Sequence, residues 1–176
     1  LKAAAKTSVG IHSVAEEIQI RHLVRQIEMI EEQLSEIDKK IEEFSLQNDS
    51  PILSIPGISH FSGTSILADL GDICNYTKAS QIIKFAGVAP YHHESSQFTA
   101  QHTAITKKGS RYLRKTLYQI ILTVINNNKV FTAYYNKKLA EGKGHRCAQG
   151  HCIRKLLRII YHLLSTGQTF DPDLLR

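Results

Sequence analysis

The sequence contains few cysteines and no long apolar segment. Its three cysteines among 176 residues are an odd number and too few for a disulfide framework, so reduced thiols are expected. No apolar run approaches the roughly 20 residues needed to cross a bilayer, and the polar N-terminus does not resemble a signal peptide. These absences argue against a disulfide-rich secreted domain and a membrane protein, and we expect a soluble, cytoplasmic chain. Because the sequence begins with Leu1 and not with Met, we expect a fragment of a longer protein.

Acidic residues are almost missing from one stretch of the chain. Between Ala100 and His162 there are 13 lysines and arginines and a single acid, Glu141, whereas residues 1–50 carry 6 basic and 10 acidic residues. A local excess of this size is typical of a surface that binds phosphates. The alternative is a solvated face that only aids solubility, which by itself explains so strong an asymmetry poorly. The second half of the chain is therefore expected to bind nucleic acid.

The most regular apolar pattern lies in the first 48 residues. Large apolar residues recur there at spacings of three and four: Ile20, Leu23, Ile27, Ile30, Leu34, Ile37, Ile41 and Phe44. A capping box formed by Ser13 and Glu16 precedes this seam, and Asn48-Asp49-Ser50-Pro51 ends it. The pattern predicts a coiled-coil helix that pairs with a second copy of the chain or with a helix outside this sequence. Because isoleucine dominates both seam positions, the number of subunits stays open.

After Pro51 the pattern changes to short helices separated by turns that contain glycine. Apolar spacing, caps and glycine stops predict one helical turn at Pro51 and helices over 61–70, 77–87, 111–126, 130–141 and 146–165. Residues 88–104 lack helical periodicity, which predicts a loop with at most a short extended piece. The expected fold class is all-α. Residues 1–48 form a linker and a coiled-coil helix, and residues 49–176 form a compact multi-helix domain.

The segment Ile55-Pro56-Gly57-Ile58 resembles the hairpin of a helix-hairpin-helix unit. In such a unit Gly57 permits a tight turn, and the start of the following helix, at Ser59 and His60, approaches a phosphate without reading base sequence. The motif normally has a second glycine where this chain has Ser59. The alternative role of the hairpin is to pack helices together, and both roles are compatible.

Two adjacent serines, Ser95 and Ser96, precede a cluster of basic residues. The cluster comprises Lys107, Lys108, Arg111, Arg114 and Lys115, of which the last three share one helical face. Attack of a hydroxyl on a phosphodiester needs cations that stabilise the developing charge and a base or metal that takes the proton. The cations are present, whereas no base is obvious beyond His92, His93 and Glu94. A loop serine by itself is more often a hydrogen-bonding turn residue.

The last predicted helix carries a second basic group. Arg154, Lys155 and Arg158 follow a basic pattern of i, i+1 and i+4, and we expect them to contact phosphates. On the preceding helix, Tyr134 and Tyr135 could stack on bases, although packing between helices is favoured.

The histidines and cysteines at His145, Cys147, His151 and Cys152 raise the question of a zinc site. Cys147 and Cys152 lie five residues apart and would not share a helical face, so no metal site is expected. Cys152 and Cys74 are instead expected to be small buried residues.

The ordered series of motifs resembles the C-terminal domain of the IS-one-ten type of insertion-sequence transposases, relatives of the pilin-gene invertases. The motifs are I-P-G-I at 55–58, G-D-I at 71–73, F-A-G-V-A-P at 85–90, E-S-S-Q-F at 94–98, I-T-K-K-G-S-R-Y-L-R at 105–114 and I-R-K-L-L-R-I-I-Y at 153–161. The similarity covers about residues 49–170, and the ordered series is far more specific than any single motif.

The resemblance implies a DNA transposase or site-specific recombinase of a bacterial transposable element. In that family a loop serine forms a phosphoserine link to DNA. The register relative to the I-T-K motif favours Ser95, with Ser96 in reserve because the family usually has glycine after the serine.

The resemblance also implies partners that this chain does not contain. They are DNA, a structured non-coding guide ("bridge") RNA and an upstream nuclease-like domain whose four acids bind magnesium. We expect no cofactor in this fragment, magnesium in the full-length enzyme through the missing N-terminal domain, and no activity of the fragment alone. The rival hypothesis is a non-catalytic module for nucleic-acid binding and oligomerisation.

Overall fold

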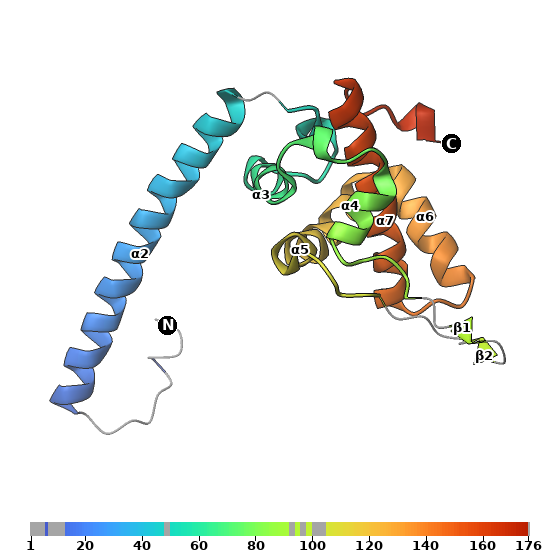
Figure 1. The fold of residues 1–176 in the computed structure, drawn as a ribbon. Coiled ribbons are helices and arrows are strands. Elements are labelled where there is room, and N and C mark those ends of the chain that lie inside the picture. Colours follow the sequence, from blue (N-terminus) through green and yellow to red (C-terminus); the bar gives the residue numbers. More distant parts are fainter. Residues whose placement is uncertain are drawn as a thin grey trace. The chain divides into compact units, whose positions relative to one another are not determined.

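The computed structural model has the all-α fold that the sequence predicts. It describes residues 6, 13–47, 50–91, 94–95, 98–99 and 105–175. Within these ranges the strands are limited to an antiparallel pair of two-residue strands, β1 (Glu94–Ser95) and β2 (Phe98–Thr99), in the segment expected to be a loop. The chain divides into two units, residues 1–40 and 41–176 (Figure 1).

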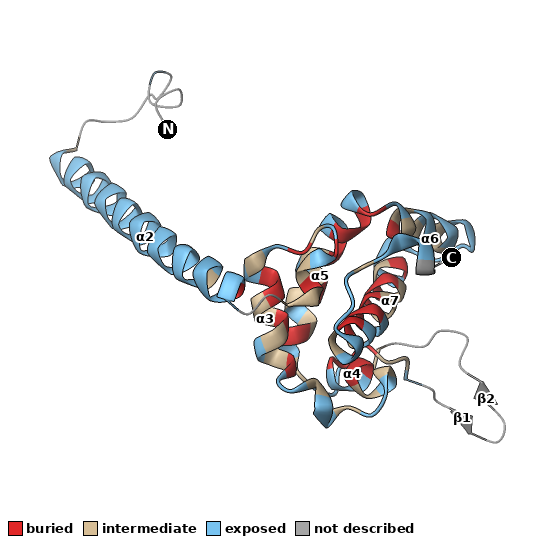
Figure 2. Cartoon of the chain, turned by 90° about the horizontal axis from the view of Figure 1, so that it is seen from above, coloured by how far each residue is buried: buried red, intermediate tan, exposed pale blue. Residues whose placement is uncertain are grey.

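Helix α2 (Val14–Gln47) corresponds to the predicted seam helix. Half of the predicted capping box is formed at its start, where the backbone N–H of Glu16 donates to Ser13 Oγ at 3.4 Å. The seam side chains from Ile20 to Ile37 are between 50% and 61% exposed, and α2 is exposed along nearly its whole length in Figure 2. The apolar seam is thus left available for a partner.

The second unit consists of short helices. The predicted ones, which lie between residues 51 and 166, have bounds within two residues of the prediction, whereas the short turns at 73–75 and 172–175 were not predicted. The helices of this unit are η1 (Pro51–Ser54), α3 (His60–Leu70), η2 (Ile73–Asn75), α4 (Ala79–Phe85), α5 (Arg111–Asn127), α6 (Lys129–Ala140), α7 (His145–Thr166) and η3 (Pro172–Leu175). Side-chain caps fix several starts: Ser110 Oγ accepts the N–H of Leu113 at α5, and Asn128 Oδ1 accepts the N–H of Val130 at α6.

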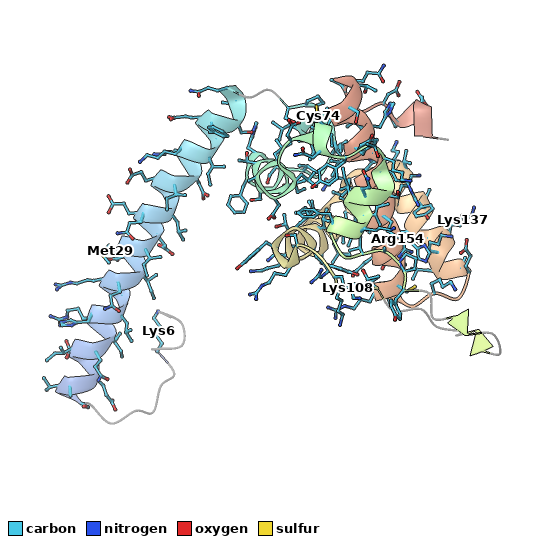
Figure 3. All side chains as sticks on the ribbon, viewed as in Figure 1. Lys6, Met29, Cys74, Lys108, Lys137 and Arg154 are labelled. Atoms are coloured by element: carbon cyan, nitrogen blue, oxygen red, sulfur yellow. The ribbon has the colours of Figure 1, made fainter. Side chains whose placement is uncertain are left out.

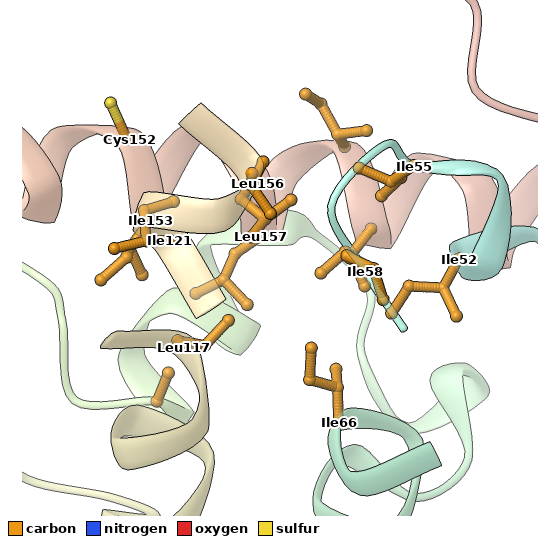
Figure 4. Close-up of a cluster of buried hydrophobic side chains, with 14 of the residues drawn as sticks. Ile52, Ile55, Ile58, Ile66, Leu117, Ile121, Cys152, Ile153, Leu156 and Leu157 are labelled. Carbon is orange, nitrogen blue, oxygen red and sulfur yellow. The ribbon is translucent and has the colours of Figure 1, made fainter. Parts of the chain in front are cut away.

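Helix α7 forms the centre of the apolar core and contacts α4, α5 and α6. Figure 4 shows its Ile153, Leu156 and Leu157 near side chains of α5 and of the turn around η1. On α5 the side chains of Leu113, Leu117, Ile121 and Val124 are buried, and Ile120 packs partly buried against the same core. Each such side chain contributes about 1.5–3 kcal/mol by leaving water.

The expectations for the cysteines are half right. Cys152 is fully buried on α7. The prediction for Cys74 is wrong: it is exposed, because it lies in the single surface turn η2, whose start is capped by Asp72 Oδ1 accepting the N–H of Cys74 at 2.8 Å.

No helix within the described ranges has the length and apolar character required to span a membrane.

Candidate nucleic-acid interface

Residues 91–104, which contain Ser95 and Ser96, are here called the serine segment. The motifs that precede and follow it, at 85–90 and 105–114, lie against each other. Three backbone hydrogen bonds join them: Thr106 N–H to Ala89 O (2.9 Å), Lys107 N–H to Gly87 O (3.0 Å) and Ser110 N–H to Phe85 O (2.7 Å). An isolated antiparallel bridge between Pro90 and Ile105 completes the pairing. The residues on either side of the serine segment, Pro90 and Ile105, are therefore held together.

Arg114 strengthens this pairing from α5. Its Nη1 donates to Ala86 O at 3.1 Å, and Gly87 makes room for it: a Cβ at Gly87, whose φ is +67°, would lie 2.5 Å from that nitrogen. Part of the Arg114 guanidinium, predicted to bind phosphate, thus holds the protein backbone. A guanidinium carries five N–H donors, so this bond leaves others for a ligand.

Four of the five members of the first basic cluster line a groove beside α5, here called the α5 groove. It has a volume of about 610 Å³ and is lined by Ile105, Lys107, Arg111, Arg114, Lys115, Tyr118, Gln119 and Arg146. Five of these residues are basic and none is acidic. Lys108 is exposed but does not line this groove (Figure 3).

A second groove, the α7 groove, continues from the first. It has a volume of about 640 Å³ and is lined by Pro90, Ile105, Tyr118, Gly142, Lys143, Gly144, Arg146, Cys147, Gly150, His151 and Arg154. The two grooves share Ile105, Tyr118 and Arg146. Pro90 and Ile105, the residues that flank the serine segment, both line the α7 groove, so the segment starts and ends at its edge.

Sequence analysis missed Tyr118, Lys143 and Arg146 as groove residues. Arg146 lies 31 positions after Lys115 in the sequence, yet it completes the same groove. Helical spacing relates residues of one helix only, so it could not place Arg146 beside Lys115. The one feature of the sequence that pointed to Arg146 was its position in the strongly basic stretch between residues 100 and 162.

The three residues of α7 that were predicted to contact phosphates, Arg154, Lys155 and Arg158, do not form one site. Arg154 lines the α7 groove, and its Nη1 donates to Val88 O at 3.4 Å. Lys155 and Arg158 instead line a separate pocket of about 310 Å³ with His162 and Phe170. The ammonium of Lys155 lies 4.9 Å from the centre of the Tyr134 ring, and burial lowers the pKa of Lys155. Lys155 thus packs against Tyr134 in a pocket that is separate from the α7 groove.

The hairpin residues make contacts within the protein. Gly57 has φ +96°, and a Cβ on it would lie 2.7 Å from Val124 Cα of α5, so the hairpin packs directly on a helix. Ser59 Oγ accepts the N–H of Ser62, and Ser62 Oγ accepts the N–H of Ser59, which caps α3. His60 Nδ1 lies 2.9 Å from Ser45 Oγ. These contacts give the hairpin a role in packing helices together. Phosphate binding by the hairpin stays a prediction.

Ser95 lies on β1, where it pairs with Phe98, and Ser96 lies outside the described residues, as do His92 and His93. Ser95 follows Pro90 by five positions, so its Cα lies within about 18 Å of the edge of the groove even if the chain is fully extended. The chain length thus limits how far the candidate nucleophile can be from the α7 groove.

The remaining sequence-based alternatives concern packing and metals. Tyr134 and Tyr135 are partly buried against the core, which confirms the packing role. Within the described part of the chain, no three histidine, cysteine or acidic side chains are placed to hold a metal ion.

Comparison with known proteins gives the family of this chain. Residues 49–136 match the model of the transposase IS116/IS110/IS902 family, and the chain belongs to this family.

Three relatives illustrate the match. The chain is 26% identical over 152 residues to the insertion element IS116 uncharacterized 44.8 kDa protein of Streptomyces clavuligerus, covering 85% of this chain and 38% of that protein. It is 25% identical over 153 residues to the pilin gene-inverting protein of Moraxella bovis, covering 86% and 47%. It is 28% identical over 122 residues to the transposase for insertion sequence element IS1111A of Coxiella burnetii, covering 68% and 33%. The chain thus spans less than half the length of these relatives.

Proposed function

We propose that this chain is the DNA-holding part of a transposase or site-specific recombinase, which binds the phosphate backbone in the α5 groove and brings Ser95 to it. The observation that carries this proposal is the position of five basic residues in one groove next to the fixed base of the serine segment. Family membership supports DNA as the partner.

The α5 groove suits a phosphate backbone better than a protein or a small molecule. Lys107, Arg111 and Lys115 are exposed, and no acid lines the groove to neutralise them. A DNA backbone supplies repeated negative charges, and each phosphate neutralised by such a groove releases condensed counterions. Contacts of this type position DNA without reading its sequence.

The chemical step assigned to Ser95 is a phosphoryl transfer. Its Oγ forms a bond to phosphorus while the bond from phosphorus to one deoxyribose oxygen breaks. The serine proton passes to a base, and the departing oxygen takes up a proton to become a hydroxyl. The resulting phosphoserine keeps the phosphodiester energy for rejoining to another strand, and the basic groove residues stabilise the charge that develops on the phosphate. Ser96 is the reserve nucleophile.

Among the described residues no three histidine, cysteine or acidic side chains are placed to hold a metal ion, so these residues do not fit a magnesium site. The six acids after Pro51 are scattered through the sequence rather than clustered, and only Glu141 falls within the basic stretch. We therefore assign magnesium to an acidic domain outside this chain, and the guide RNA to the full-length protein. The chain alone is expected to bind DNA without cleaving it.

We further propose that the seam of α2 pairs with a second copy of the chain. Six seam residues from Ile20 to Ile37 are half exposed or more. A seam with the same residue type at both core positions is complementary to itself, which favours a homo-oligomer. A helix from another part of the full-length protein is the competing occupant.

The binding part of the proposal is tested with the chain and a short fluorescent DNA duplex of arbitrary sequence. Substitution of both Lys115 and Arg146 by alanine is expected to weaken binding and to lower the slope of log affinity against log salt by about 0.9 per phosphate contact removed. Lys137→Ala removes an exposed lysine of α6 that lines neither groove (Figure 3) and is expected to leave the slope unchanged. Equal effects of the two changes would contradict the groove assignment.

The chemical part is tested in the full-length protein. Ser95→Ala is expected to abolish recombination while DNA affinity stays unchanged, and Ser95→Cys is a conservative comparison. If Ser95→Ala and Ser96→Ala both retain recombination, the serine attack is wrong and the chain is a non-catalytic binding and oligomerisation module.

A further inference from the structure

The α7 groove contains a histidine surrounded by positive charge. His151 lines this groove together with Lys143, Arg146 and Arg154. The charged groups that act on it come from three elements: Lys138 and Glu141 from the end of α6, Lys143 from the following turn and Arg154 from α7 itself. Four cations, counting Arg146, thus surround one imidazole.

The one acid of this region does not balance those cations. Glu141 is already paired with Lys138, whose Nζ lies 2.8 Å and 2.9 Å from the two carboxylate oxygens. The hydrogen bond from Lys138 holds the pKa of Glu141 below its usual range. The groove therefore has an excess of positive charge at His151, which an anionic ligand would neutralise.

The free protein keeps His151 mainly neutral near neutral pH. Burial, followed by Arg154, Lys138 and Lys143, lowers the pKa of His151, and the opposing effect of Glu141 is the smallest. A neutral imidazole has one N–H donor, whereas the imidazolium has two and a full charge. In the free protein the His151 imidazole is thus mostly unprotonated and can take up one proton.

We propose that Lys143, Arg146, His151 and Arg154 form a phosphate-binding subsite and that His151 takes up a proton when a DNA phosphate binds there. This inference rests on the proposed function and extends it from the α5 groove to the α7 groove. Arg146 and Tyr118 line both grooves, so a DNA backbone bound in one groove continues into the other. Pro90 and Ile105 also line the α7 groove, which puts this phosphate next to the serine segment.

The expected consequence is that DNA binds more tightly as the pH falls. A phosphate beside His151 raises the pKa of its imidazole relative to the free protein, so the complex holds more protons than its separate components. The gain is complete below the pKa of His151 in the free protein and is lost as the pH rises through its pKa in the complex. A difference of one pKa unit between the bound and free states corresponds to an affinity change of about tenfold.

The test measures the affinity of the chain for a short fluorescent DNA duplex from about pH 8 to about pH 5.5 at constant ionic strength. The unchanged chain is expected to bind about tenfold more tightly at the lower pH, whereas His151→Gln should lose most of this dependence. His162→Gln is the matched control, because His162 lines the separate pocket of Lys155 and Arg158. That variant is expected to keep the full pH dependence.

An NMR titration of the His151 imidazole provides the direct measurement. With the duplex bound, its midpoint should move to higher pH, and Arg146→Ala should reduce that movement. An unchanged midpoint, or an equal pH dependence in His151→Gln, would overturn the subsite. Steeply salt-dependent binding without a movement of the midpoint would leave the proposed function standing, whereas binding insensitive to salt would contradict the proposed function itself.

Discussion

Replacement of Gly57 by alanine tests whether the hairpin serves packing or phosphate binding. Gly57 has φ +96°, and an added Cβ would meet Val124 Cα at 2.7 Å and Val124 N and Thr123 O at 2.9 Å. All three atoms belong to the backbone of α5, so no side-chain rotation can relieve the contact. The hairpin or the helix would have to shift.

The expected loss in the free energy of unfolding has two parts. An alanine forced into positive φ costs about 1–2 kcal/mol. Overpacking against a rigid neighbour costs about 1–3 kcal/mol more. The sum of about 2–5 kcal/mol is a large fraction of the about 5–15 kcal/mol by which a domain of this kind is stable.

The assay is equilibrium unfolding in urea with Gly167→Ala as the control. Gly167 also has positive φ, at +70°, but a Cβ there would meet nothing within 4 Å, so only the conformational cost of about 1–2 kcal/mol is expected. Equal losses in the two variants would refute the packing argument. A Gly57→Ala protein of unchanged stability with weaker DNA binding would instead assign the hairpin to phosphate recognition.

Three further predictions follow from burial, capping and the seam. Burial raises the pKa of Cys152 to about 11, so a thiol reagent should label the two exposed cysteines in the native protein and this third one only after unfolding; three rapid reactions would contradict its burial. Ser110→Ala removes the cap of α5 and should lower stability by about 1 kcal/mol in urea unfolding, and no loss would mean that water replaces the cap. Leu34→Lys on the seam should reduce the oligomer mass measured by light scattering, whereas Met29→Lys, also exposed but off the seam, should not; an unchanged mass in the seam variant would exclude pairing of two copies there.

The helices could be predicted from the sequence because their signals are local. In α5 the apolar residues at spacings of three and four are the buried ones, and Ser110 caps the helix at the position that the pattern indicates. Cys74 shows the limit of this reasoning. Its residue type favours burial, but its place in a single turn at the surface exposes it, and residue type alone does not reveal that place.

The candidate site was harder to predict because it depends on contacts between distant segments. The spacing of Arg111, Arg114 and Lys115 indicates a common helical face, but not what lies opposite that face. In the fold, Arg114 meets the carbonyl of Ala86, 28 residues earlier in the chain. On α7 the same reasoning grouped Arg154 with Lys155 and Arg158, although the helix directs them into different cavities.

The fixed base of the serine segment has a physical consequence for the proposed reaction. Backbone hydrogen bonds between residues 85–89 and 106–110 hold both ends of the segment at the grooves. Because Ser95 follows Pro90 by five residues, its Cα stays within about 18 Å of the edge of the α7 groove, and such a tether gives its hydroxyl an effective concentration of millimolar order or above there. Orientation can then raise the rate further, provided that the phosphate is held still. The cations of the two grooves would hold the phosphate still. For the serine to act, these cations and the hydrogen bonds that fix the ends of the serine segment must therefore belong to the same part of the fold.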